Sequence, residues 1–451
     1  MIGWFLSLME NLICKRNPAY VASLAHIGTR RIIVKIQLFR LRRTVKYAYE
    51  RSEFYRQAFR ERGIKPSDIR SASDLTKIPF TTPLDLQRDP YSFLAVPREK
   101  IARVFTSGGT TGSPKKIFYS KRDVENIAQI NAIGLSMLGI KETDTIQIML
   151  SYGRPSWIGG AITEMGGQKL RATVIASGDT LSTEEQIQTI KELGSTVLVG
   201  YPPYLHRVTE EASNNEDLTQ LGIHTIILGA QPWPESLRKY LQEKWNSKVY
   251  DAYGLTEIGG VAGECRIQNG LHINEFDLLP EIVDPSTGER LEYGEEGELV
   301  FTTLNREGMP LLRYRTHDLS YFIEEPCGCG LNTLRIGRIP GRTDDMAKVG
   351  TGEFIFPNMF DQVILNLEGI LDYQIVLEKE GFKDKIIVKA EADEKTERMK
   401  QKLFDALLQV SPIARDVEVT QTIATPEVVL LKPGTLKKAS EIKVRKIIDR
   451  R

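Results

Sequence analysis

The sequence has little of what defines several classes of protein. It holds four cysteines in 451 residues, which excludes a small scaffold built from disulfides. An excess of charge of one sign is also missing, since 60 basic and 59 acidic residues leave a formal net charge of +1. A nucleic acid is therefore not expected as a general partner. No apolar run is long enough to cross a bilayer, so we expect no membrane span and a cytoplasmic protein.

Two kinds of secondary-structure pattern are present. Apolar, β-rich runs at 145–150, 171–177, 195–201 and 224–229 alternate with helical patterns such as 184–193 and 234–245, which predicts parallel βαβ units. Glycine-rich turns and short strands from 280–304 onward predict an antiparallel section, and 358–422 predicts a small α+β unit. Basic and apolar residues mix at helical spacing from Arg30. A membrane-surface helix is one interpretation of this segment, and the one we favour is a pair of surface helices whose cations face water.

A glycine-rich loop, TSGGTTGSPK at 106–115, is the first candidate for a binding site. Glycines let backbone N–H groups close on phosphate oxygens, and hydroxyls and an ammonium add donors. The residues concerned are Thr106, Ser107, Gly108, Gly109, Thr110, Thr111, Gly112 and Lys115. The spacing does not fit the Walker pattern, because the position five residues after Gly108 is serine and the one after Gly109 is proline. In isolation the loop could also be a flexible polar turn.

A carboxylate and a cysteine/histidine set are the next candidates. Glu257 in DAYGLTE (251–257) follows a probable strand, where α/β sheets present ligand-binding groups, and it could hold Mg²⁺ against ATP phosphates. Cys265, His272, Cys327 and Cys329 offer four soft ligands. Three thiolates and an imidazole suit a closed, tetrahedral, structural Zn²⁺ site. The alternative is three ordinary reduced thiols and a loop histidine.

Together with LRYRTHD (312–318), GRTDDM (341–346) and SEIK (440–443), these segments resemble the adenylate-forming superfamily, most closely its phenylacetate–coenzyme A ligase branch. The resemblance extends from about Val45 to Arg451. It implies an α/β fold with a large N-terminal AMP-binding domain, 1–343, and a small mobile α+β C-terminal domain, 344–451. Asp344 is the counterpart of the family's hinge residue, about which the small domain rotates between two half-reactions. Some members of the branch have a similar cysteine/histidine set that binds zinc.

The resemblance also implies roles for individual residues. It assigns the metal to Glu257, the α-phosphate to Thr256 and the catalytic cation to Lys443. Lys437, Lys438 and Lys446 lie close by and leave other registers open for this cation, and a basic C-terminal tail that merely stays solvated is a separate alternative. The ATP-binding set further includes Gly229, Ala230, Gln231, Asp251, Tyr253, Gly254, Asp318 and Arg342. Gln231 stands where the branch usually has glutamate.

The implied reaction is ATP-dependent activation of a carboxylic acid to acyl-AMP, followed by transfer to coenzyme A. Tyr152, Trp157, Gly159 and Gly160 fall where the branch builds its acyl pocket and would suit an aryl or arylacetic acid, although core packing explains them almost as well. Two other functions stay open: an adenylyltransferase that moves AMP onto a hydroxyl, and a scaffold built on an inactive ligase. A separate carrier protein and a homodimer also stay open as partners.

Overall fold

The computed structural model describes residues 30–107, 115–152, 157–343, 346–365, 367, 369–392, 395–436 and 446–451. The chain forms two compact units. The first consists of Met1–Gln231, Lys239–Thr316 and Ser320–Arg338, and the second of Pro232–Arg238, His317–Leu319 and Ile339–Arg451. Each unit is described on its own below.

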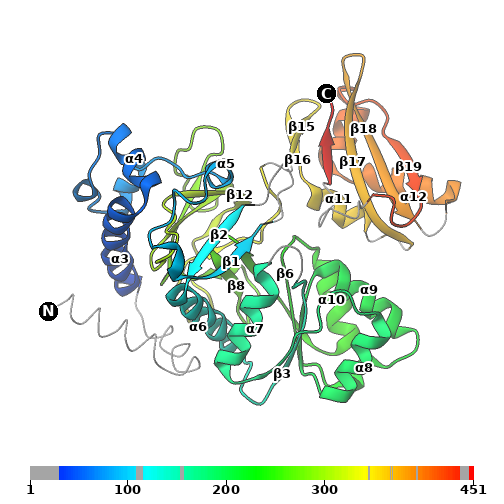
Figure 1. Ribbon diagram of the computed structural model, residues 1–451. Helices are drawn as coiled ribbons and strands as arrows, with labels where there is room; N and C mark the ends of the chain where they lie inside the picture. Colours follow the sequence, from blue (N-terminus) through cyan, green and yellow to red (C-terminus); the bar gives the residue numbers. More distant parts are fainter. Residues whose placement is uncertain are drawn as a thin grey trace. The chain divides into compact units, whose positions relative to one another are not determined.

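A nine-stranded sheet forms the centre of the first unit (Figure 1). Five neighbouring strands are parallel, which confirms the predicted βαβ units. Four further strands continue the sheet, each paired antiparallel with its neighbour. In spatial order the strands are β4 (Thr173–Ile175), β3 (Thr145–Met149), β5 (Val197–Gly200), β6 (Thr225–Gly229), β7 (Lys248–Leu255), β8 (Gly259–Glu264), β9 (Leu271–Ile273), β14 (Arg335–Ile336) and β13 (Phe322–Ile323).

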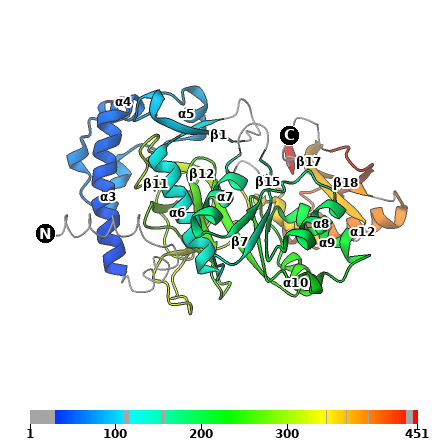
Figure 2. The same ribbon diagram turned by 60° about the horizontal axis from the view of Figure 1, so that its bottom comes forward.

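Helices cover both faces of the parallel strands (Figures 1 and 2). The chain runs outward from β3 to β4 and then returns across the sheet to β5, β6 and β7. Right-handed crossovers therefore place α7 (Ile158–Leu170) on one face and α8 (Thr183–Leu193), α9 (Pro202–Ser213) and α10 (Glu235–Trp245) on the other. Helix α6 (Lys121–Met137) packs beside α7. The loops that follow β3, β5, β6 and β7 consequently gather at one edge of the sheet.

Two smaller β structures complete the first unit. The antiparallel ribbon of β1 (Ile101–Thr106) and β2 (Lys116–Ser120) flanks the glycine-rich loop. A three-stranded sheet is formed by β10 (Leu278–Val283), β11 (Gly297–Thr303) and β12 (Tyr314–Ser320), although His317–Leu319 of β12 belong to the second unit. Strands β10 and β11 pair antiparallel, as predicted for this section. Short 3₁₀ helices lie at Pro66–Asp68, Ala72–Lys77, Arg98–Lys100 and Leu218–Leu221.

Helices α3 (Arg30–Arg51), α4 (Glu53–Glu61) and α5 (Pro83–Arg88) precede the ribbon. Helix α3 packs on β10, and the Gln37 side chain donates to the carbonyl of Leu278 at 3.0 Å. The expected pair of helices is present, but the prediction that their cations face water is wrong for Arg40. This side chain is buried, and its guanidinium lies 3.4 Å from the Asp277 carboxylate. A cation inside the protein requires such a nearby acceptor. None of the helices in the described ranges is both long and apolar enough to cross a membrane.

The second unit contains the predicted α+β fold. Its sheet has the order β19 (Glu427–Leu431), β18 (Lys383–Ala392), β17 (Ile370–Glu380), β20 (Ile447–Asp449). The helices are α11 (Pro357–Ile364), α12 (Glu397–Leu407) and α13 (Ser411–Glu418), and β15 (Ala347–Val349) pairs with β16 (Glu353–Ile355). A continuous apolar core that includes Phe360, Tyr373 and Leu403 holds these elements together. The boundary at 343/344 stays a prediction.

Candidate active site

Glu257 lies in the tight turn between β7 and β8. Leu255 pairs with Gly259 across the hairpin, so the turn projects from the edge of the sheet where the parallel strands end. The Glu257 side chain is 5% exposed, and its Oε1 lies 2.5 Å from Nζ of Lys115. Tyr314 donates its hydroxyl to the same oxygen at 2.9 Å. Two residues predicted for the ATP site, 142 positions apart in the sequence, are therefore in direct contact.

The charge of this carboxylate follows from its surroundings. Burial alone raises the pKa of Glu257, but the Lys115 ammonium and the hydrogen bonds to the carboxylate outweigh burial and hold the pKa below its ordinary value. Glu257 is thus an anion at neutral pH. An ionised, buried carboxylate of this kind is suited to bind a metal ion in place of the lysine ammonium.

Backbone contacts constrain the neighbouring residues of the set. Gly229 ends β6, and a Cβ atom there would lie 2.7 Å from the carbonyl oxygen of Ala252, so only glycine allows β6 and β7 to approach this closely. Ala230 has a φ of 72°, a left-handed conformation that costs a non-glycine residue free energy. Asp251 accepts a hydrogen bond from Nε of Arg338 at 2.9 Å.

In the second unit, Asp318 and Arg342 form a pair. Nη1 of Arg342 donates to Oδ1 of Asp318 at 2.9 Å, and the two residues also form an isolated antiparallel bridge. His317, with a φ of 64°, lies 3.0 Å from the Thr343 hydroxyl through Nδ1. The residues expected to bind the ribose therefore lie together in this unit.

The residues expected around the acid lie after β3 and at the start of α7. Tyr152 lies against Gly160, where a Cβ atom would be 3.0 Å from the phenol ring. Trp157 faces Tyr201 edge-on, with ring centroids 6.5 Å apart. Burial raises the pKa of Tyr201 to about 12, so its phenol stays neutral.

Two buried donors near these segments have no hydrogen-bond partner among the described residues. They are Nε1 of Trp157 and the hydroxyl of Ser107, which lies at the start of the glycine-rich loop. A buried donor without an acceptor costs roughly 1–3 kcal/mol, so each would gain from a bound acceptor.

Several predicted residues lie outside the described part of the chain: Gly108, Gly109, Thr110, Thr111, Gly112, Asp344 and Lys443.

The cysteine/histidine set lies at the other end of β8. Sγ of Cys265 is 3.6 Å from Sγ of Cys327, and Sγ of Cys329 is 3.4 Å from Nε2 of His272. All four donor atoms lie within 4.8 Å of one another. Tetrahedral zinc with bonds of about 2.3 Å to sulfur needs neighbouring ligands about 3.8 Å apart, so the spacing fits. Nδ1 of His272 contacts the Thr333 hydroxyl at 2.9 Å, which orients the ring as in metal sites.

Sequence reasoning missed several contacts at these sites. Tyr314 lies within the LRYRTHD segment, so the motif itself offered a signal for it. Tyr119, Arg306 and Arg338 lie outside the quoted motifs. Tyr119 donates to the carbonyl of Thr256 at 2.8 Å, and Arg306 donates to that of Ile258 at 2.5 Å.

Comparisons with known proteins agree with the geometry. Residues 25–305 match the model of the AMP-binding enzyme family, and 352–451 match that of the AMP-binding enzyme C-terminal domain. The chain therefore belongs to the AMP-binding enzyme family, which confirms the predicted superfamily.

The similar curated proteins include several phenylacetate–coenzyme A ligases. The protein of Thermus thermophilus is 37% identical over 433 residues, covering 92% of this chain and 96% of the relative. That of Escherichia coli is 36% identical and covers 80% and 82%. A crystal structure of 2-hydroxyisobutyryl-CoA ligase in its postadenylation state has a TM-score of 0.81 at 22% identity, with 94% of this chain and 90% of the other covered. This likeness confirms the fold class.

Proposed function

We propose that this chain is an AMP-forming acid–thiol ligase, which activates a carboxylic acid with ATP and then transfers the acyl group to coenzyme A. The proposal depends on one observation above all: an ionised, buried Glu257 in contact with Lys115 at the end of a parallel sheet. The similarity to phenylacetate–coenzyme A ligases over most of the chain supports the same chemistry.

The first half-reaction forms an acyl adenylate. A carboxylate oxygen of the acid attacks the α-phosphorus, the bond from that phosphorus to the bridging oxygen breaks, and pyrophosphate leaves. Negative charges approach one another in this step, so donors and cations must be placed beforehand. Lys115 and the Ser107 hydroxyl are suited to the phosphates, because the hydroxyl is a buried donor with no acceptor in the described part of the chain.

Glu257 fits a magnesium ion, since its carboxylate is ionised at neutral pH and buried beside a single ammonium group. When bound, magnesium would neutralise phosphate charge and orient the triphosphate. Glu257 would hold this ion, and Tyr314 fixes the orientation of the Glu257 carboxylate by donating a hydrogen bond to Oε1.

The second unit supplies the remaining groups in this proposal. Asp318 offers acceptor oxygens to the ribose hydroxyls, and Arg342 offers a fork of donors to ribose and phosphate. Lys443 places a cation where charge develops at the α-phosphorus. Rotation of a C-terminal domain about Asp344 would then remove Lys443 before the thiolate of coenzyme A attacks the acyl carbon and the carbon–oxygen bond to AMP breaks.

An aryl or arylacetic acid suits the side chains after β3. Tyr152 and Trp157 follow β3, Tyr201 follows β5, and the rings of Trp157 and Tyr201 lie edge-on to each other. Gly160 allows the Tyr152 ring to lie directly against α7. The buried N–H of Trp157 has no partner among the residues that the structure describes, and it favours an acid with a hydrogen-bond acceptor on its ring, because such an acceptor would satisfy this donor.

We also propose one structural zinc ion per chain at Cys265, His272, Cys327 and Cys329. Four protein ligands leave no coordination position for water or substrate, so this ion would stabilise the fold without joining the reaction. The backbone N–H groups of Ile267 and Leu331 point at the sulfurs of Cys265 and Cys329, at 3.5 and 3.4 Å, and would stabilise thiolates there.

A pyrophosphate-release screen of aromatic and aliphatic acids, with and without coenzyme A, tests the proposed function. We expect release with a subset of aromatic acids and formation of free AMP only when the thiol is present. A stable AMP ester without free AMP would instead indicate an adenylyltransferase. Absence of acid-dependent release across the whole panel would indicate an inactive scaffold.

A further inference from the structure

The turn that presents Glu257 is fixed by side-chain hydrogen bonds to two of its backbone carbonyls. The carbonyl of Thr256 accepts a hydrogen bond from the Tyr119 hydroxyl at 2.8 Å, and the carbonyl of Ile258 accepts one from Nη2 of Arg306 at 2.5 Å. These carbonyls belong to the residues immediately before and after Glu257. The backbone on both sides of the carboxylate is therefore fixed by side chains that do not touch the carboxylate itself.

The two holding side chains also support each other. The guanidinium carbon of Arg306 lies 4.1 Å above the centre of the Tyr119 ring, within the range of a cation–π interaction. Tyr119 is fully buried, and burial raises the pKa of its phenol, so the hydroxyl remains a donor. Tyr119 lies in β2, the strand that begins directly after Lys115, and thereby connects the strand next to Lys115 with the turn that presents Glu257.

The loop that supplies Arg306 is fixed in turn by helix α6. Asp123 accepts hydrogen bonds from the backbone N–H groups of Glu307 and Gly308, each at 2.7 Å. A Cβ atom at position 308 would lie 2.9 Å from Oδ2 of Asp123, so glycine is needed for this contact. Ser120, at the end of β2, donates to the Glu307 carboxylate at 2.7 Å.

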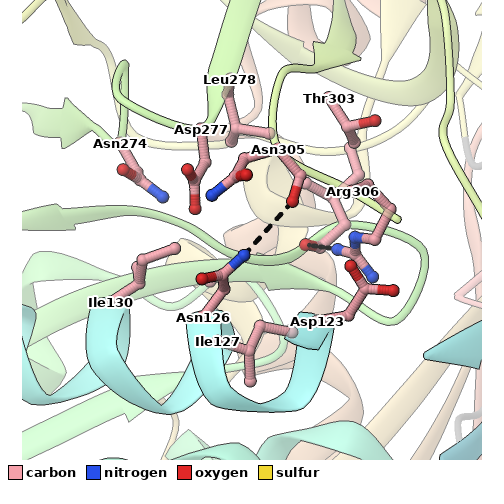
Figure 3. Close-up of a pocket in the computed structure, with 12 residues that line it drawn as sticks. Asp123, Asn126, Ile127, Ile130, Asn274, Asp277, Leu278, Thr303, Asn305 and Arg306 are labelled. Atoms are coloured by element: carbon pink, nitrogen blue, oxygen red, sulfur yellow. Dashed lines mark hydrogen bonds between the residues drawn. The ribbon is translucent and has the colours of Figure 1, made fainter. Parts of the chain in front are cut away.

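Beside Arg306 lies a small cavity of about 20 Å³ with both polar and apolar side chains in its lining, shown in Figure 3. Asp123 and Asn126 of α6 line one side of it, and Asn274, Asp277 and Asn305 line the other. A cavity of this size has room for about one water molecule. Nη1 of Arg306 is buried without a hydrogen-bond partner among the described residues, and a water there would give this nitrogen an acceptor.

We infer that Tyr119 and Arg306 are positioning residues that hold the Thr256–Ile258 turn so that Glu257 binds the metal of the metal–ATP complex. The inference rests on the proposed function, because it assumes that Glu257 is the metal ligand. Neither side chain needs to contact a substrate. Both act by limiting the movement of the backbone on either side of the carboxylate, as outer-shell partners do in other metal sites.

Tyr119→Phe and Arg306→Lys test the inference. The first removes only a hydroxyl, and the second keeps the charge but loses the planar fork of donors. With full-length protein and a non-hydrolysable ATP analogue, Mn²⁺ binding measured by electron paramagnetic resonance should weaken by about tenfold in each variant, the low end of outer-shell effects. The double variant should lose little more, since both bonds hold one turn. In activity assays, the Mg²⁺ concentration for half-maximal pyrophosphate release should rise, and saturating Mg²⁺ should restore the rate.

Matched controls separate positioning from general destabilisation. Tyr204→Phe removes a phenol that donates to the carbonyl of Leu181 at 2.9 Å, and Arg122→Lys removes an arginine contact with Asn305 at 3.1 Å. Both controls should bind Mn²⁺ within about twofold of the unmodified protein, since neither contacts the turn. If Tyr119→Phe and Arg306→Lys behave like these controls while Glu257→Gln abolishes binding, the inference is wrong and the proposed function stands. If Glu257→Gln binds Mn²⁺ as tightly as the unmodified protein, the inference and the metal role of Glu257 fall together.

Discussion

Strand β8 separates two very different groups of polar side chains. At its start, one carboxylate, Glu257, is in contact with an ammonium group and a phenol. At its end, Cys265 lies beside the thiols of Cys327 and Cys329 and the imidazole of His272, with all four donor atoms within 4.8 Å of one another. The first group is incomplete as a metal site and leaves coordination positions for a ligand, whereas the second has a full set of four. On this difference we base the proposal that one end of the strand takes part in the reaction and the other stabilises the fold.

The largest expected effect comes from Glu257→Gln at the incomplete end. A neutral amide cannot hold the metal that shields the phosphates, so acid-dependent pyrophosphate release should fall by about a thousandfold, several kcal/mol of transition-state stabilisation. Steady-state kinetics with saturating ATP measures this. Glu298→Gln is the matched control, because Glu298 is also buried and paired with an arginine, Arg315. Equal losses in both variants would contradict a special role for Glu257.

Lys443→Ala should have the next largest effect. Loss of one placed charge should slow adenylation by about a hundredfold, while thioester formation from supplied acyl-AMP should survive. Single-turnover measurements of the two half-reactions distinguish the steps. A matched change at a neighbouring cation, Lys446→Ala, should spare adenylation, and a parallel fall of both half-reactions in Lys443→Ala would refute the division of labour.

At the complete end, Cys329→Ser should affect stability more than chemistry. We expect the zinc content to fall from about one ion per chain to near zero, and the melting temperature to fall with it, because metal binding contributes to folding free energy. Atomic emission and calorimetry on unchelated protein give the two values. Cys14→Ser should leave the zinc content unchanged. Unmodified protein purified without zinc, or a Cys329→Ser variant that keeps its zinc, would remove the contrast between the two ends.

The smallest expected effect concerns the acid. Trp157→Phe keeps an aromatic ring but removes the N–H group that has no partner in the described ranges. Acids that carry an oxygen substituent on their ring should therefore lose about tenfold in kcat/KM, the contribution of one neutral hydrogen bond. The parent acids without that oxygen should be nearly unaffected. Trp233→Phe serves as the control. Equal losses for both acids would show that Trp157 acts by packing alone.

The sequence predicted the architecture where local patterns repeat. Alternating apolar runs and helical patterns predicted parallel strands β3 to β7, because buried strands and amphipathic helices have different periodicities. The spacing of Cys265, His272, Cys327 and Cys329 predicted a set that the structure brings together, since few soft ligands occur in the chain. Arg40 shows the limit of such patterns: a cation at helical spacing was expected in water and is buried beside Asp277.

Contacts between distant single residues could not be predicted in the same way. Tyr119 and Arg306 reach the same turn from a strand and from a loop 187 positions apart, and neither belongs to a repeating pattern. Only the packing of β2 against the sheet and the fixing of the 306–308 loop by Asp123 bring them together. Motifs assigned both Lys115 and Glu257 to the ATP site, whereas their direct contact and the hydrogen bond from Tyr314 came only from the three-dimensional fold.

The position of Trp157 and Tyr152 has a consequence for how the substrate preference of this protein can evolve. Both lie after β3 and at the start of α7, whereas the Glu257 turn is held by Tyr119 and Arg306. If the first group binds the acid, as proposed, substitutions there can alter which acid is preferred while the second group stays intact. Descendants of this protein could then come to use new acids through a few substitutions and keep the ATP site of their ancestor.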